Sequence, residues 1–133
     1  MKTVLHAMVF CVLGAFGAQA QEAEIQGTIS QQFEAFKADD FASAFEFASP
    51  TLQTFFQTPE NFGRMVTQGY PMVWRPAQVM FLELREEGGT YWQKVQITDK
   101  KGRFHVLEYR MQQLESGWRI NGVQILDAPG AAV

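Results

Sequence analysis

The sequence has little of the chemistry that thiol catalysis and soft metal sites need. Its 133 residues include one cysteine, Cys11, and two histidines, His6 and His105. Cys11 and His6 both lie in an apolar N-terminal segment, so the remainder has one histidine and no thiol. That remainder has no internal disulfide, no Cys-His nucleophile and no cysteine-based zinc or iron site. One histidine among scattered carboxylates is poor support for a metal site. We expect neither a metal nor a cofactor.

The N-terminal segment has the pattern of a secretory signal peptide. Lys2 precedes an apolar run over residues 4–17, and the small-residue sequence Ala18-Gln19-Ala20 follows. The run is shorter than the about 20 apolar residues that a membrane span needs, and no later stretch is as apolar. The pattern predicts cleavage between Ala20 and Gln21, and an exported protein, periplasmic or secreted, with no membrane span.

Composition indicates one folded domain behind this segment. We expect a signal peptide over residues 1–20, a single domain over residues 21–128 and a short tail over residues 129–133. With 47% hydrophobic residues the chain is too apolar for disorder and too short for two domains. Acidic residues outnumber basic ones by 14 to 11, and loss of Lys2 makes the balance more negative. This is the wrong sign for binding a phosphate backbone, so we expect no nucleic-acid partner.

The hydrophobic periodicity changes once, near Tyr70. Before it, four segments have helical spacing or helix-start signals: residues 25–36, 41–48, 50–56 and 58–69. Asp39-Asp40 and Thr58-Pro59 are typical of helix N-termini, where free N–H groups donate to a capping side-chain oxygen and proline loses no hydrogen bond. Beyond Tyr70, Pro71 and Pro76 predict an extended connection instead of a helix.

Four strands joined by short glycine-bearing turns follow this connection: residues 78–85, 90–99, 103–114 and 118–126. Such short links make every neighbouring pair antiparallel. Helices followed by an antiparallel meander predict an α+β fold, with the helices packed on one face of the sheet.

Turn lengths predict which strand residues face the helices. A three-residue loop ending in Gly102 pairs three sets of residues: Ile97 with His105, Val95 with Leu107, and Gln93 with Tyr109. Even loop lengths in the other two turns bring further residues to this face: Met80, Leu82, Leu84 and Tyr91 from the first two strands, and Trp118, Ile120, Gly122 and Gln124 from the last. A slip by one residue would turn a strand over.

The predicted inward face is apolar with four polar exceptions: Gln93, His105, Tyr109 and Gln124. One interpretation is that they satisfy helix ends or water inside a core. The other is an apolar pocket between helices and sheet, in which a few polar groups orient a small ligand. The candidate lining residues are Gln93, His105, Tyr109, Gln124, Tyr91 and Trp118.

The segment from Tyr70 to Pro76 combines two aromatic residues, a cation and two prolines. Tyr70 and Trp74 suit a cap on the core where helices give way to the sheet, with the stem of Arg75 lying along the surface. The alternative is that Tyr70, Trp74 and Arg75 form a pocket rim or a protein-docking edge.

Several short sequences resemble the bacterial family known as domain of unknown function 4864. The stretches that carry the resemblance are Ala38-Asp39-Asp40-Phe41, Phe47-Ala48-Ser49-Pro50-Thr51, Thr58-Pro59-Glu60, Gly69 to Pro76 and Gly117 to Val123. The resemblance covers about Ile25 to Leu126, and Gly69 to Pro76 is its most specific part. It implies membership of the nuclear transport factor 2-like (cystatin-like) superfamily, and therefore a cone-shaped fold in which a strongly curved sheet holds a helical layer.

The resemblance implies no activity, because that superfamily includes isomerases, hydrolases, ligand-binding modules and scaffolds. Its isomerases and epoxide hydrolases use aspartates within the cone, whereas the aspartates here are predicted at a helix start, a turn and a strand end. We therefore expect a non-catalytic small-ligand-binding or interaction module that takes a small apolar ligand. One alternative is an isomerase or hydrolase with His105 as acid/base and Tyr109 as hydrogen-bond donor. Another is a scaffold or homodimer formed through the sheet.

Overall fold

The computed structural model describes residues 2–126, so the expected tail over residues 129–133 lies outside the described part. Five helices come first within it: α1 (Lys2–Lys37), α2 (Phe41–Glu46), α3 (Pro50–Phe56), α4 (Pro59–Gly69) and α5 (Pro71–Trp74). Four strands follow: β1 (Gln78–Glu87), β2 (Thr90–Thr98), β3 (Phe104–Leu114) and β4 (Gly117–Leu126). They form an antiparallel sheet in the order β1-β2-β3-β4. The predicted α+β architecture is confirmed.

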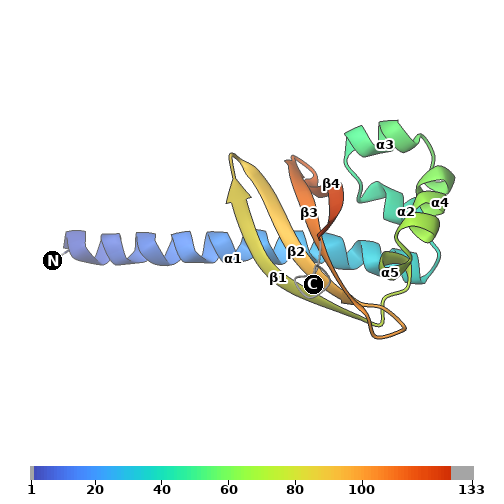
Figure 1. The fold of residues 1–133 in the computed structure, drawn as a ribbon. Helices are drawn as coiled ribbons and strands as arrows, with labels where there is room; N and C mark the ends of the chain where they lie inside the picture. Colours follow the sequence, from blue (N-terminus) through green and yellow to red (C-terminus); the bar gives the residue numbers. More distant parts are fainter. Residues whose placement is uncertain (1, 127–133) are drawn as a thin grey trace.

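Helix α1 crosses the sheet, and the shorter helices gather beside its C-terminal end (Figure 1). Its buried residues recur every three or four positions: Ile25, Ile29, Phe33 and Phe36. This stripe is the face that packs on the sheet. The helix continues toward the N-terminus without a break through Ala20-Gln21, and residues 17–20 are exposed. No helix of the described part is long and apolar enough to cross a membrane.

Side-chain caps start three of the short helices. The Asp40 carboxylate accepts a hydrogen bond from the Ser43 amide at the start of α2. Ser49 and Thr58 do the same for α3 and α4, where prolines occupy the first helical positions. These caps satisfy N–H groups that have no partner within a helix, and they confirm the predicted helix starts.

The predicted extended connection between Pro71 and Pro76 is wrong, because Pro71–Trp74 forms the single turn α5. Proline is tolerated at the first position of a helix, where its missing N–H costs no hydrogen bond. Of the two prolines, only Pro76 lies outside the helix, in the link between α5 and β1. Val73 in this turn is buried.

The predicted register of the central hairpin is confirmed. Ile97 lies opposite His105, Val95 opposite Leu107 and Gln93 opposite Tyr109. Gly102 has φ +81°, a conformation that side chains with a Cβ rarely adopt. The loop length and this glycine together place the apolar residues of β2 and β3 on one face.

Strand β1 departs from the predicted register at a bulge. The Gly88-Gly89 turn pairs Glu87 with Thr90, which turns Leu84 inward as predicted. The register then shifts between Phe81 and Leu84, so that Val79 and Phe81 face the helices. Met80 and Leu82 were expected there, and Met80 is instead 46% exposed. The extra residue reverses which side chains of β1 point inward. The prediction failed here because β1 has apolar residues on both faces.

Strand β4 contains a second shift. Trp118 and Ile120 are buried on the inward face as predicted. Ile120 lies opposite Met111 and Gly122 opposite Arg110, so Asn121 is the additional residue. Beyond it, Val123 lies opposite Tyr109, on the inward face. Gly122 and Gln124 therefore do not alternate inward as predicted.

The bulge in β1 is stabilised by Gln93. The side chain of Gln93 is fully buried, and its amide nitrogen lies 3.0 Å from the carbonyl oxygen of Leu82 and 3.3 Å from that of Glu83. The same nitrogen lies 2.9 Å from its neighbour's carbonyl, that of Lys94. One buried glutamine thus donates to carbonyls at a point where the regular ladder is interrupted.

Replacing Gln93 by leucine should destabilise the protein. Gln93→Leu replaces the amide by a somewhat shorter apolar side chain and leaves these carbonyls without the donor, which we expect to cost about 2 kcal/mol of unfolding free energy. Urea denaturation followed by circular dichroism measures the difference. The matched change Gln96→Leu, on the other face of β2, should stay within about 0.5 kcal/mol of the parent. Equal losses in the two variants would contradict the role given to Gln93.

Candidate functional site

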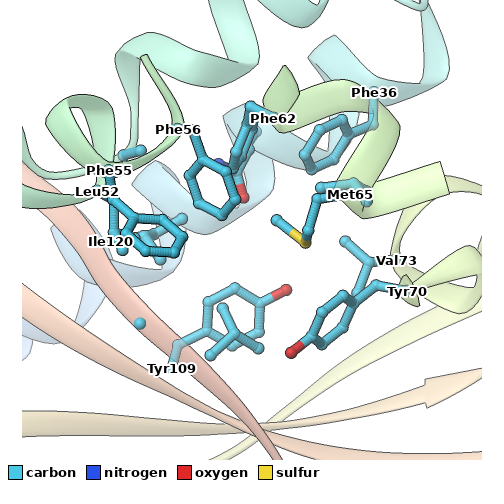
Figure 2. A pocket seen from close by; sticks show the side chains of 15 residues that line it. Phe36, Leu52, Phe55, Phe56, Phe62, Met65, Tyr70, Val73, Tyr109 and Ile120 are labelled. Carbon is cyan, nitrogen blue, oxygen red and sulfur yellow. The ribbon is translucent and has the colours of Figure 1, made fainter. Parts of the chain in front are cut away.

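A cavity of about 380 Å³ lies between the short helices and the last two strands. Figure 2 shows aromatic side chains of the helices on one side and Tyr109 of β3 on the other. The lining residues from the helices and the links between them are Gln32, Phe36, Ala48, Leu52, Phe55, Phe56, Phe62, Met65, Val66, Tyr70 and Val73. Those from the sheet are Tyr109, Ile120, Gly122 and Val123. We call this cavity the α3–β4 pocket.

The pocket exists because the chain before α3 is attached to the bulged part of β4. The amide of Ile120 donates to the carbonyl of Phe47, and the amide of Ser49 donates to the carbonyl of Ile120, each at 2.8 Å. The Ser49 hydroxyl also donates to the side-chain oxygen of Asn121, the additional residue of the bulge, at 2.6 Å. These bonds hold the start of α3 at the sheet. The rest of α3 buries no side chain.

Aromatic contacts form the helical wall of the pocket. The ring centroid of Phe62 lies 5.9 Å from that of Phe36, 5.4 Å from that of Phe45 and 5.5 Å from that of Phe56. At these spacings the rings are in direct contact. Phe55 is in edge contact with Phe56 but is 75% exposed, so it stands at the mouth of the pocket.

Tyr109 is the polar group at the floor of the pocket. The residue is 1% exposed, and the structure records no hydrogen bond between its hydroxyl and any of residues 17–126. Burial raises the pKa of Tyr109 well above its usual range, and the nearby Tyr70 adds to this effect. The hydroxyl therefore stays protonated at neutral pH. Both tyrosine hydroxyls point into the pocket (Figure 2).

The structure brings two of the predicted site residues together, Tyr109 and Tyr70. Gln93 donates to backbone carbonyls at the β1 bulge and does not line the pocket. Gln124 was expected inward but lies exposed on the outer face opposite Glu108, because the shift at Asn121 turns the strand over.

Tyr91 and Trp118 face inward but pack against α1, away from the pocket. Their rings meet edge to face at 5.2 Å. The Tyr91 hydroxyl lies 3.4 Å from the side-chain oxygen of Gln21, and the indole N–H of Trp118 donates to Glu24 at 3.2 Å. Through Gln21 and Glu24, these contacts attach α1 to the sheet just after the predicted cleavage site.

His105 faces inward as predicted but is tied to the hairpin turn. Its Nε2 lies 2.9 Å from Oδ2 of Asp99. His105 does not line the α3–β4 pocket, whereas Tyr109, four residues further along β3, does. The two residues therefore do not form the pair that the enzyme alternative required.

Trp74 and Arg75 act as a clamp on the end of α1. The Arg75 guanidinium makes two hydrogen bonds to the Asp39 carboxylate, at 2.9 and 3.0 Å, and the indole N–H of Trp74 donates to the same group at 2.9 Å. Arg75 also donates to the carbonyl of Phe36 at 2.9 Å. The cluster holds α5 beside α1. Because Tyr70 directly precedes α5, the cluster also fixes the position of Tyr70.

The residues missed by sequence analysis are those that the helices contribute. Phenylalanines such as Phe55, Phe56 and Phe62 have the spacing of ordinary core residues, and the sequence carries no sign that one side of them is open. Among the described side chains, those of residues 17–126, no group of three or more histidine, cysteine or carboxylate groups is arranged to hold a metal ion.

Comparison with known proteins gives two matches. Residues 18–133 match the family described as "Domain of unknown function (DUF4864)". The chain is also similar to the crystal structure of an NTF-2 like protein of unknown function from Burkholderia xenovorans LB400, with 15% sequence identity and a TM-score of 0.48 over 83% of this chain and 91% of that one. Among proteins with curated descriptions, no match is found.

The Asp99–His105 contact predicts acid sensitivity. Hydrogen bonds from His105 and from the amides of Arg103 and Lys101 lower the pKa of Asp99 from 3.8 to about 2. A carboxylate with a lowered pKa stabilises the fold fully above its unfolded pKa, near 3.8, and this contribution is lost as pH falls toward 2. The melting temperature of Asp99→Asn should therefore fall less between pH 4 and pH 2 than that of the parent.

The control for this prediction is Glu115→Gln. Glu115 is exposed in the β3–β4 turn, where the structure records no ion pair for it with residues 2–126. Its melting curve should follow the parent's over the same pH interval. A parent-like acid response of Asp99→Asn would show that Asp99 does not contribute.

Proposed function

Because the chain belongs to the DUF4864 family, whose description assigns no activity, we propose a function from the α3–β4 pocket itself: the protein is a binding module for a small apolar ligand. The observation that carries the proposal is Tyr109, a fully buried side chain whose hydroxyl faces the pocket without a recorded hydrogen bond in the described chain. A hydroxyl that faces the pocket in this way can donate to a ligand atom without giving up a hydrogen bond recorded within the described chain.

The size and composition of the pocket support the proposal. Its volume of about 380 Å³ lies within the range of about 300–1,000 Å³ that is typical of small-molecule sites. The walls are aromatic and aliphatic, with few polar groups, which is the usual composition of such sites. Exposure of the Phe55 ring to water at the mouth of the pocket is unfavourable, and contact of this ring with an apolar ligand would be favourable.

Catalysis is less well supported. The lining residues include no histidine and no carboxylate that could move a proton. The Tyr109 hydroxyl, kept protonated by burial, suits hydrogen bonding to a bound molecule better than removal of a proton from it. Binding alone requires only the groups that the pocket contains.

Pocket occupancy can be tested with N-phenylnaphthylamine, an uncharged probe whose fluorescence rises in apolar surroundings. The parent should bind it saturably. Met65→Trp places a larger side chain in the pocket and should weaken binding about tenfold, which corresponds to about 1.4 kcal/mol. Fluorescence titration measures the dissociation constant, and circular dichroism verifies folding.

The same substitution elsewhere provides the control. Met80→Trp lies on the outer face of the sheet, at a position already 46% exposed, and should bind the probe within about twofold of the parent, since distant surface changes have small effects. A parent that does not bind the probe, or equal weakening in both variants, would reject the pocket as the site.

We further propose that the protein is exported and that residues 1–20 are removed. The described side chains at 17–20 are exposed, and the buried core begins at Ile25, so cleavage after Ala20 removes no described core residue. The family match, which begins at residue 18, leaves out nearly all of the apolar segment. Both observations support a domain that is complete without the segment.

Expression in a bacterial host tests the export proposal. Intact mass measurement of the periplasmic fraction should find a chain that begins at Gln21. Ala20→Phe should block processing, because signal peptidase sites need a small residue directly before the cut. Gln19→Phe, at the unrestricted middle position, should be processed normally. An unprocessed parent in the cytoplasm would refute the proposal.

A further inference from the structure

The charge and hydrogen-bonding character of the pocket restrict what it can bind. We infer that its ligands are uncharged, ring-bearing molecules with a carbonyl-type oxygen that Tyr109 and Tyr70 hold by hydrogen bonds. This inference rests on the proposed function, since it specifies the ligand class of the same pocket.

The absence of charge among the lining residues argues for an uncharged ligand. None of the 15 residues that line the pocket carries a charge. A carboxylate or an ammonium group moved from water into such surroundings loses its hydration and gains no opposite charge in return. Anionic and cationic ligands are therefore disfavoured relative to neutral ones of the same shape.

The two tyrosines argue for an acceptor oxygen on the ligand. Tyr109 and Tyr70 come from β3 and from the start of α5, and both hydroxyls point into the pocket. Each phenol has one O–H to donate, and for neither does the structure record a hydrogen bond to a described residue. A carbonyl oxygen has two lone pairs and can accept both bonds, whereas a hydrocarbon accepts none.

The aromatic wall argues for a flat ring system. Phe36 and Phe56 each pack against Phe62, and the three rings line one side of the pocket. Aromatic faces and edges pack closely against other rings in stacked or edge-to-face arrangements. A fused ring can contact this wall while its substituent lies at the tyrosines.

Three naphthalenes substituted at the same ring position separate these requirements. Acetylnaphthalene is neutral and accepts hydrogen bonds, ethylnaphthalene has almost the same shape without an acceptor, and naphthoate is anionic at neutral pH. The quantity to compare is the affinity for acetylnaphthalene divided by the affinity for ethylnaphthalene. We expect this ratio to be at least about fivefold higher in the parent than in Tyr109→Phe, because the variant lacks the O–H donor. Naphthoate should bind at least about tenfold more weakly than acetylnaphthalene.

The comparison between proteins is what isolates the hydrogen bond. Ethylnaphthalene and acetylnaphthalene differ in water solubility, but that difference cancels when their affinity ratio in the parent is divided by the ratio in a variant. Tyr70→Phe should lower the ratio in the same direction as Tyr109→Phe. Tyr91→Phe is the matched control, since the Tyr91 hydroxyl contacts Gln21 outside the pocket, and it should leave the ratio unchanged.

The outcomes distinguish this inference from the proposed function. If neither N-phenylnaphthylamine nor any of the three compounds binds the parent, both are refuted. If N-phenylnaphthylamine binds and none of the three compounds does so in isothermal titration calorimetry, only the ligand class is wrong. If they bind but the affinity ratio is the same in the parent and Tyr109→Phe, or if naphthoate binds as well as acetylnaphthalene, only the ligand class is wrong and the pocket remains a binding site. Circular dichroism and melting temperature establish that each tyrosine variant is folded.

Discussion

The attachment of the helical layer to one point of β4 determines most of what this protein can do. Two backbone hydrogen bonds join Phe47 and Ser49 to Ile120, and the Ser49 hydroxyl binds Asn121, the additional residue of the bulge. Because α3 is held at its start and none of its side chains is fully buried, space remains beneath it. A regular β4 without this bulge would direct different side chains at the helices, and Val123 would not face the pocket.

Buried polar groups on the inward face serve two different purposes. The two N–H donors of the Gln93 amide are shared among three backbone carbonyls beside the β1 bulge, so its burial is compensated within the fold. The hydroxyl of Tyr109, directly opposite on β3, faces the α3–β4 pocket with no recorded partner in the described residues. The first arrangement stabilises the protein, and the second leaves hydrogen-bonding capacity for another molecule.

Local patterns predicted the helices, the strands and the central hairpin, because caps and turns act within a few residues. Asp40, Ser49 and Thr58 begin helices where expected, and Gly102 sets the pairing of β2 with β3. The bulges escaped prediction because the sequences of β1 and β4 offer suitable side chains to either face. Of the six expected lining residues, only Tyr109 lies in the pocket, since bulges and packing against α1 redirected or occupied the others.

The sequence by itself determined the α+β order, the helix starts, the scarcity of thiol and imidazole chemistry, and the inward position of Tyr109, because each follows from composition or from short-range geometry. The tertiary structure decided where the empty space lies. It placed Tyr70 opposite Tyr109 and left Phe55 exposed at the mouth, through contacts between segments far apart in the chain. A cavity is defined by what several elements together fail to fill, and no single segment encodes that.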